Sequence, residues 1–211
     1  MSAEVTPRPG LAALFPGGAG TVSGSPWRER LIIEAAELTR SGGWQAITMA
    51  KLADRVGVSR QTVYNEIGTK QALGEAMMMR EVEGFLRSVD AAFESNSGDL
   101  VAAIREAAGG VLRDAATNPL LHAVLSASHG AESALLPLLT TEAEPIIAAA
   151  QVLIRGHLEA YDLPISDDRI GALVDMVIRL VLSHVTTPTG TPEKTAEDIA
   201  WIAEQVLRSQ A

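Results

Sequence analysis

The sequence contains no cysteine and no long hydrophobic run, and these two absences exclude several classes of protein. Without cysteine the chain cannot form disulfides, iron–sulfur clusters or cysteine-containing zinc sites, and it has no thiol nucleophile. The absence also fits a reducing compartment. No run of about eighteen apolar residues occurs, and the N-terminus lacks a basic segment followed by an uninterrupted apolar stretch. We therefore expect a cytoplasmic protein with neither a membrane-spanning helix nor a signal peptide.

Motifs of catalysis and of metal binding are also missing. The sequence has no nucleophile elbow, no His-Glu-x-x-His motif and no phosphate-binding loop, because its one glycine-rich stretch, residues 17–20, lacks the strand and helix that such a loop joins. No histidine lies four residues from another; the histidines are His122, His129, His157 and His184. We therefore expect no enzymatic activity, no bound metal and no cofactor.

Length and composition indicate a folded protein with unevenly distributed charge. The chain has 211 residues, of which 47% are hydrophobic and 20% charged, values typical of globular proteins. This length suits one domain with an appendage or two small domains. The net charge is −9, yet residues 27–70 contain seven basic and five acidic residues. The basic side chains that could meet a polyanion are therefore concentrated in one segment.

The first 70 residues divide into an arm and a set of short helices. Residues 1–26 are rich in Gly, Pro, Ser and Thr, which favours a flexible arm. From residue 27 the apolar spacing becomes helical, with Ser25 placed to cap the helix and Pro26 at its first position. The glycine pair at 42–43 should end this helix.

Two further helices follow, and the connection between them is very short. Thr48 is placed to cap the second helix, which Gly57 should end after about two turns. Ser59 is placed to cap the third helix, and Gly68 should close it. Two short helices separated by three residues indicate a helix-turn-helix.

The rest of the chain has helical periodicity without strand alternation, so the sequence predicts an all-α fold. Two prolines, Pro137 and Pro145, suggest that one of the predicted helices is kinked or split. The predicted helices span residues 70–95, 99–117, 119–128, 131–161, 166–187 and 193–209.

The third helix, residues 60–67, has the pattern of a DNA-recognition helix. Val63 and Ile67 lie four residues apart and should pack inward, which leaves the polar side chains facing outward. Those that could face DNA are Arg60, Gln61, Thr62, Tyr64 and Asn65.

These residue types can read bases and bind phosphates. An arginine such as Arg60 can donate two hydrogen bonds to guanine, and Gln61 or Asn65 can pair with adenine. The hydroxyls of Thr62 and Tyr64 suit phosphate oxygens. Lys70 lies in the first turn of the next helix, where exposed backbone N–H groups favour a further phosphate.

The segment from Arg30 to Leu73 resembles the DNA-binding domain of TetR-family transcriptional regulators. The matching residues are the alanines at 35–36, Gly43, Thr48, Leu-Ala at 52–53, Gly-Val-Ser at 57–59, Thr-Val-Tyr at 62–64 and Lys70. The resemblance implies that Thr48, Thr62, Tyr64 and Lys70 hold phosphates and that Arg60, Gln61 and Asn65 lie nearest the bases. Many members have His-Phe where this chain has Glu66-Ile67, and we exclude Glu66 because a carboxylate repels phosphate.

The resemblance and the residue pattern together predict three regions. Residues 1–26 form a flexible arm, residues 27–70 an N-terminal three-helix DNA-binding domain, and residues 71–211 a C-terminal helical ligand-binding and dimerisation domain. The segment 170–182 is apolar on nearly all sides, so we expect it to pair with a second subunit in a homodimer; the alternative is a central helix within a monomer. The predicted interface residues are Leu173, Val177, Val181, Trp201 and Val206.

A stripe of apolar residues runs along the predicted helix 70–95, and further aliphatic residues lie in the helices that follow it. Together they predict a ligand cavity. Because the chain has only three phenylalanines and two tyrosines, such a cavity suits a flexible aliphatic molecule better than a planar cation. The candidate residues are Met78, Val82, Phe85, Val89, Phe93, Leu112, Leu121, Leu125, Ile147 and Ile154. A headgroup could meet Arg155, Arg179 or a histidine, among which the sequence does not choose.

The expected function is that of a ligand-responsive transcriptional regulator. We expect a repressor that binds a palindromic operator in double-stranded DNA as a homodimer and is released by a fatty acid, an acyl thioester or a similar hydrophobic effector. Two alternatives remain at this point. One is a helical lipid-binding carrier without specific DNA binding, and the other is a small helical enzyme with an unrecognised site.

Overall fold

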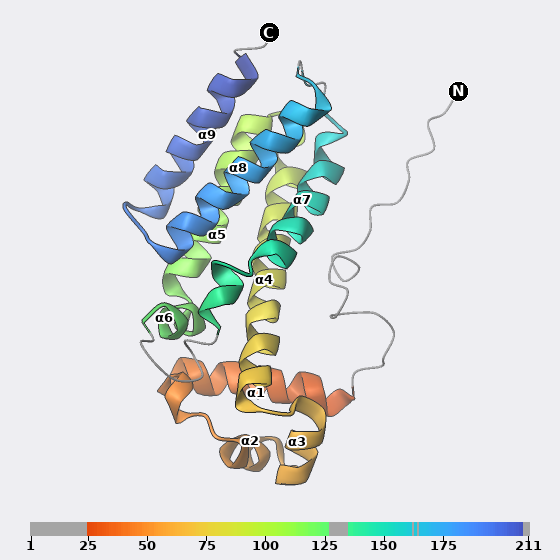
Figure 1. Ribbon diagram of the computed structural model, residues 1–211, viewed down its shortest axis with the longest axis vertical. Coiled ribbons are helices and arrows are strands. Elements are labelled where there is room, and N and C mark those ends of the chain that lie inside the picture. Colours follow the sequence, from red (N-terminus) through yellow and green to blue (C-terminus); the bar gives the residue numbers. More distant parts are fainter. Residues whose placement is uncertain (1–24, 127–134, 162, 164, 209–211) are drawn as a thin grey trace, which may run out of the picture.

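The structure is a computed structural model that describes residues 25–126, 135–161, 163 and 165–208, and in these residues it contains helices and no strand (Figure 1). The α-helices are α1 (Pro26–Gly42), α2 (Met49–Val56), α3 (Arg60–Ile67), α4 (Lys70–Ser95), α5 (Leu100–Thr117), α6 (Pro119–Ser126), α7 (Glu144–Leu158), α8 (Asp167–Thr186) and α9 (Pro192–Arg208). Two 3₁₀ helices, η2 (Trp44–Ala46) and η3 (Leu136–Leu139), connect them. The predicted all-α fold is confirmed.

Helices α1, α2 and α3 form an N-terminal unit at one end of the molecule (Figure 1). The predicted caps are present: the side chains of Ser25, Thr48 and Ser59 each accept a hydrogen bond from a backbone N–H in the first turn of the helix that follows. Gly43 and Gly57 end α1 and α2 with positive φ angles of 75° and 77°, which glycine adopts without a Cβ clash. Local sequence therefore fixes the limits of these short helices.

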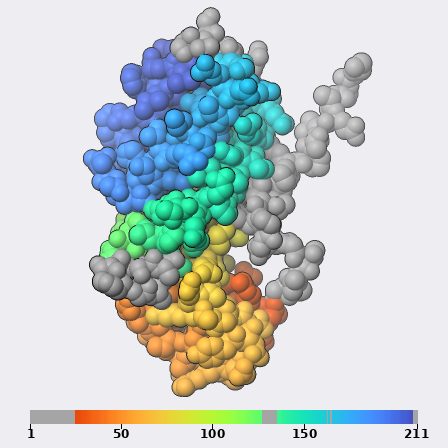
Figure 2. Space-filling model, in the orientation of Figure 1, coloured from red at the N-terminus to blue at the C-terminus, as the bar shows by residue number. Residues whose placement is uncertain are grey.

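The remaining helices form a bundle that rises from this unit, as the space-filling view also shows (Figure 2). The long helix α4 begins at the N-terminal unit and runs the length of the bundle, where it packs against α5 and α7. Helix α5 also packs against α9 and α8, and α8 packs against α7. Because α4 is continuous from residue 70 to residue 95, it connects the N-terminal unit directly to the centre of the bundle.

The predicted helix 131–161 is split, as Pro137 and Pro145 suggested. The described part of this stretch contains the short η3, a turn and then α7, which starts at Glu144 with Pro145 in its first turn. Proline is favoured in a first helical turn but not in a helix interior, so it marks a helix start here. The predicted limits of the other helices agree with the structure to within two residues.

Two predictions fall on residues that the structure does not describe. The arm predicted for residues 1–26 lies outside the described residues, except that Ser25 caps α1 and Pro26 begins it. Residues 127–134, which include His129, also lie outside them. Across the described residues, no helix is long and apolar enough to cross a membrane.

Candidate DNA interface and effector cavity

The turn between α2 and α3 brings the two helices together with little freedom. Gly57 has φ 77° and ψ 36°, and its N–H donates to the Ala53 carbonyl at 2.9 Å. Two residues later, the Ser59 hydroxyl accepts from the Thr62 N–H at 3.0 Å. A side chain at position 57 would have to adopt the left-handed conformation, so glycine keeps this turn unstrained.

Helix α3 has one face in the core and the other in solvent. Val63 is fully buried and Ile67 is nearly so, as the pattern predicts. The outward side chains include Tyr64, which is 52% exposed although tyrosine is a large, partly apolar residue. Arg60, Gln61 and Asn65 are also exposed, and Thr62 is half-buried. The predicted DNA-contact residues of α3 therefore share one accessible face.

Several of these polar side chains are hydrogen-bonded to each other. Gln61 Nε2 donates to Asn65 Oδ1 at 2.9 Å, one helical turn away. The hydroxyls of Ser59 and Thr62 lie 2.9 Å apart, and Thr48 accepts from the Lys51 N–H at 3.1 Å. These bonds limit the rotamers of the side chains before any ligand binds.

Lys70 has an unusual partner at the start of α4. Its ammonium lies 5.0 Å from the centroid of the Trp44 ring, within the range of a cation–π interaction. Trp44 itself is only 1% exposed. Thr69 caps α4 by accepting from the Ala72 N–H at 3.1 Å. Lys70 is thus held against the N-terminal unit beside the positive end of a helix.

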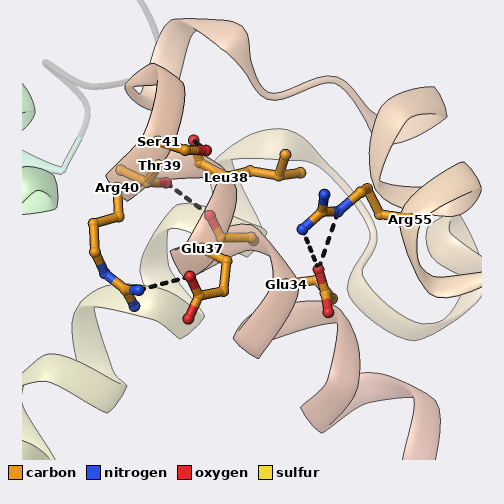
Figure 3. Close-up of polar contacts among 8 residues, drawn as sticks. Glu34, Glu37, Leu38, Thr39, Arg40, Ser41 and Arg55 are labelled. Carbon is orange, nitrogen blue, oxygen red and sulfur yellow. Dashed lines mark hydrogen bonds and ion pairs between the residues drawn. The ribbon is translucent and has the colours of Figure 1, made fainter.

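Two other basic residues of the N-terminal unit, Arg40 and Arg55, are bound in ion pairs, as the close-up of the α1 region shows (Figure 3). Arg55 of α2 reaches Glu34 of α1 at 3.3 Å, which connects the two helices. Arg40 pairs with Glu37 one turn away at 2.6 Å. By contrast, Arg60 has no ion-pair partner among the described residues. The basic side chain at the start of α3 is therefore available to an anionic ligand.

A cavity of about 120 Å³ lies in the bundle, between α4 and α5 on one side and α7 and α8 on the other. Its wall residues are Val82, Phe85, Leu86, Val89, Phe93, Leu100, Ile104, Ala107, Ala108, Val111, Leu139, Ile146, Ala150, Ile154, Leu158, Leu163, Ile165, Ile170, Leu173, Val174, Val177, Ile178, Val181, Leu182 and Val185. Every one of them is aliphatic or phenylalanine.

The structure brings half of the predicted ligand residues to this wall. Those present are Val82, Phe85, Val89, Phe93 and Ile154. Those that do not line it are Met78, Leu112, Leu121, Leu125 and Ile147. Met78 and Leu121 are fully buried, and Leu112 and Ile147 nearly so, because they fill contacts between helices. An apolar stripe on a helix thus includes core residues and wall residues, and periodicity does not separate them.

The dimer residues predicted on α8 also lie on the cavity wall. Leu173, Val177 and Val181 line the cavity together with most of the inner face of the helix. The two predicted on α9 are on the surface, with Trp201 60% and Val206 38% exposed. Two further large apolar residues are exposed on these helices and are not among the five predicted interface residues. Met176 on α8 is 62% exposed, and Ile202 on α9 is 41% exposed.

None of the candidate headgroup partners on described residues lies on the wall. Arg155 is exposed on α7. Arg179 is bound to Asp175 at 2.8 Å, and this carboxylate raises the pKa of the Arg179 guanidinium. His157 is buried with its Nε2 2.7 Å from Asp90, and His184 Nδ1 lies 2.8 Å from the Leu180 carbonyl.

A second hollow, of about 380 Å³, lies where the N-terminal unit meets the bundle. Side chains of α1, α4, α5 and α6 line it, and they include Arg40, Glu81 and Asp114. Phe85 borders both this hollow and the apolar cavity. The N-terminal unit is therefore not solidly packed against the bundle on this side.

Two family models match the chain. Residues 31–77 match the model described as bacterial regulatory proteins of the tetR family, and residues 99–205 match the C-terminal domain of the bacterial tetracyclin repressor. The first covers α2, α3 and most of α1, and the second covers the helices that enclose the cavity from α5 onward. Both belong to regulators that bind DNA, not to enzymes.

Individual relatives agree with these models. The chain is 28% identical over 173 residues to the HTH-type transcriptional regulator AlkX of Mycobacterium tuberculosis, which covers 82% of this chain and 81% of that protein. It is similar in structure to the TetR family repressor AlkX of a Dietzia species, implicated in biodegradation of n-alkanes, with a TM-score of 0.70, 25% identity and coverage of 86% of this chain and 98% of that one.

A more distant structure supports the fold alone. The FadR regulator of fatty acid degradation from Bacillus halodurans superimposes with a TM-score of 0.51 at 13% identity, over 84% of this chain and 94% of the other. The two family models together span the three-helix unit with its helix-turn-helix and most of the bundle with its cavity. The chain therefore belongs to the TetR family of bacterial transcriptional regulators.

Proposed function

We propose that this chain is a ligand-responsive repressor that binds a palindromic operator as a homodimer and is released by a hydrophobic, aliphatic effector. The observation that carries the proposal is the course of α4. This helix starts with Lys70 beside the N-terminal unit and continues as one wall of the apolar cavity from Val82 to Phe93. One rigid element thus touches both the DNA-binding unit and the effector site.

On the DNA side, Arg60, Gln61 and Asn65 are the proposed base contacts, and Thr48, Thr62, Tyr64 and Lys70 the proposed phosphate contacts. The exposed face of α3 supports the first set, because residues at the start of a recognition helix reach base edges in the major groove. The hydroxyls and Lys70 flank that face and suit phosphate oxygens. Residues 27–70 would then act as the DNA-binding domain and residues 71–211 as the effector-binding and dimerisation domain.

A homodimer supplies the second recognition helix that a palindrome needs. A single eight-residue helix such as α3 contacts too few bases to specify a site alone. Two copies must hold their recognition helices about 34–36 Å apart to enter successive major grooves. The exposed apolar residues of α8 and α9, Met176, Trp201, Ile202 and Val206, supply the proposed pairing surface.

The effector class follows from the cavity wall. An aliphatic wall without charge suits an aliphatic chain, the part that the expected fatty acid and acyl thioester share. The name of the Dietzia relative, which links it to n-alkane degradation, supports the same class.

The proposed release mechanism is a tilt of α4. A chain that fills the cavity would displace α4 relative to α7 and α8, and the hollow beside α1 leaves room for the N-terminal unit to follow. A change of a few ångströms in the distance between two recognition helices prevents both from entering the groove together. By linkage, an effector–DNA coupling of about 1–3 kcal/mol weakens operator affinity about 5- to 150-fold.

A gel-shift titration tests this proposal. The purified full chain is titrated against the DNA upstream of its own gene and against random DNA of equal length, at several salt concentrations, with and without saturating medium-chain aliphatic compounds. We expect specific, salt-sensitive binding that the aliphatic compounds weaken. Equal affinity for both DNAs, together with ligand uptake, would instead support the helical lipid-binding carrier.

A further inference from the structure

The surface of the apolar cavity carries no polar atom. Its wall consists of Val, Leu, Ile, Ala and Phe side chains from α4, α5, α7, α8 and two connecting segments. The polar backbone groups of the helices are occupied in their own hydrogen bonds. A ligand inside this cavity therefore finds neither a hydrogen-bond donor nor an acceptor.

The cavity is also long for its volume. Wall residues on α4 extend from Val82 to Phe93, which at 1.5 Å per residue corresponds to a length of about 16 Å. A volume of about 120 Å³ spread along much of this length leaves a narrow channel. An apolar cavity of about 150 Å³ stays dry and takes up small apolar molecules. The shape favours an unbranched chain over a ring system.

None of the candidate headgroup partners Arg155, His157 and Arg179 lies on the wall. Arg155 directly follows the wall residue Ile154 but is exposed, with its guanidinium beside Gly171 of α8. His157 follows the wall residue Ile154 on α7 and stacks on the wall residue Phe93, at 5.1 Å between ring centroids, yet its Nε2 is bound to Asp90. Arg179 lies between the wall residues Ile178 and Val181 but is exposed and bound to Asp175. A carboxylate inside the cavity would consequently remain unpaired, and burying an unpaired charge is strongly unfavourable.

We infer that the cavity recognises the hydrocarbon chain alone, so that its preferred effector is a neutral, unbranched hydrocarbon and a carboxylate head adds nothing to binding. This inference deepens the proposed function and rests on it, because the bound hydrocarbon is an effector only if the chain is a regulator. Affinity is then set by the apolar area buried, and each methylene group strengthens binding about four-fold until the channel is full.

The test compares ligands of equal chain length that differ in their head. Octane, supplied as saturated vapour, 1-octanol and octanoate are each equilibrated with the full chain at neutral pH without DNA. Bound ligand is measured by gas chromatography after rapid gel filtration, and the thermal unfolding midpoint is recorded in parallel. We expect octane to bind at least as tightly as 1-octanol and octanoate. Tighter binding of octanoate than of octane would overturn the inference, because it requires a group that recognises the carboxylate.

A pair of valine-to-threonine variants locates the effect in the cavity. Val89→Thr places a hydroxyl on the wall with almost no change in side-chain size, and we expect octane affinity to fall three- to ten-fold while 1-octanol is affected less. Val152→Thr makes the same change on α7 at a residue that is 49% exposed and off the wall, and should change neither affinity. Unchanged octane binding in folded Val89→Thr protein would show that the chain binds elsewhere.

The inference and the proposed function can fail separately. If octane binds but the protein does not shift operator DNA, the inference that the cavity binds a neutral hydrocarbon is supported and the proposed regulatory role is wrong. If octanoate binds more tightly than octane and weakens operator binding, the proposed regulatory role is supported and the inference that the cavity recognises the hydrocarbon chain alone is wrong.

Discussion

Arg60 and Lys70 are both basic and both close to the helix-turn-helix, yet their surroundings give them different tasks. Arg60 is exposed at the first position of α3 and unpaired among the described residues, so its guanidinium is free to reach a base edge. Lys70 is half-buried and lies over Trp44, so its ammonium moves little and offers a fixed point charge. Bidentate arginine contacts carry sequence information, whereas lysine contacts to phosphate do not.

The first prediction concerns base preference. We expect Arg60→Ala to reduce the affinity for the operator more than that for random DNA, because a good bidentate contact to a base contributes about 1–3 kcal/mol of discrimination. Competition gel shifts with operator and random DNA measure the ratio. An equal loss on both DNAs would contradict the assignment of Arg60 to a base.

The second prediction concerns how the affinity for DNA depends on salt concentration. We expect Lys70→Ala to weaken binding to all DNA sequences alike and to reduce the slope of log affinity against log salt by about one, because one phosphate contact is lost. The titrations are repeated at several salt concentrations with Lys51→Ala as a control, since Lys51 is an exposed lysine of the same unit. An unchanged slope in the Lys70 variant would argue against this contact.

Residue-level features were predicted well where the cause is local. The caps at Ser25, Thr48 and Ser59 and the glycine at 57 depend only on neighbouring residues, and all are confirmed. The cavity wall depends on which helices meet across the bundle. No local signal distinguishes Val82, on the wall, from Met78, one turn earlier and in the core.

At the scale of elements, η3 connects the cavity to the N-terminal unit. Leu139, at its C-terminal end, lines the cavity, and Leu135, which precedes it, is fully buried. A Cβ atom at Gly74 of α4 would lie 2.7 Å from Leu135 Cδ1 and 3.1 Å from the Trp44 ring. Glycine at position 74 therefore permits a three-way contact between η3, α4 and the N-terminal unit.

The third prediction tests this contact with two glycine variants in the same helix. Gly74→Ala should lower the free energy of unfolding by about 1 kcal/mol, because an overpacking cost of about 1–3 kcal/mol exceeds the gain in helix propensity. Gly84→Ala, where the nearest atom is 3.7 Å from the new methyl group, should raise it by about 0.5–1 kcal/mol. Chemical denaturation measures both. A stabilised Gly74→Ala protein would mean that Leu135 and Trp44 do not constrain this position.

The limits of elements followed from sequence only where a break has a clear cause. Gly43 and Gly57 end their helices as predicted. Pro145 indicated a break in the predicted 131–161 helix, but periodicity alone could not show that the described stretch before it forms a 3₁₀ turn. Helix α8 posed a different difficulty, because an all-round apolar sequence is compatible with a subunit interface and with a cavity wall.

At the scale of the whole molecule, the exposed apolar side chains of α8 and α9 need a partner surface. Met176 and Trp201 are the most exposed large hydrophobic residues of the described chain, at 62% and 60%. Large apolar side chains this exposed on neighbouring helices support an interaction site here. Because Val177 and Val181 lie on the cavity wall, charged residues there would disturb the cavity as well as any interface.

The fourth prediction is that Trp201→Asp combined with Met176→Asp converts a dimer to a monomer at micromolar concentration. Sedimentation velocity measures the change, with Val152→Asp on α7 as a control for an added surface charge at another exposed apolar residue. The monomeric variant should lose operator affinity while keeping octane binding, because one chain supplies all the wall residues of the cavity and neither Met176 nor Trp201 is among them. A monomeric parent protein that binds the operator would refute the dimer.

The placement of the three tryptophans makes the chain its own optical probe. Trp44 is buried under the Lys70 ammonium, Trp201 is 60% exposed on α9, and Trp27 is 38% exposed at the start of α1 with Arg30 at 5.1 Å. Indole emission shifts with solvent exposure and with nearby charge, so these sites differ in wavelength and in quenching by iodide. With Trp27 and Trp201 replaced by phenylalanine, the remaining fluorescence would report, without any label, when a phosphate approaches the Lys70 ammonium that lies over the indole.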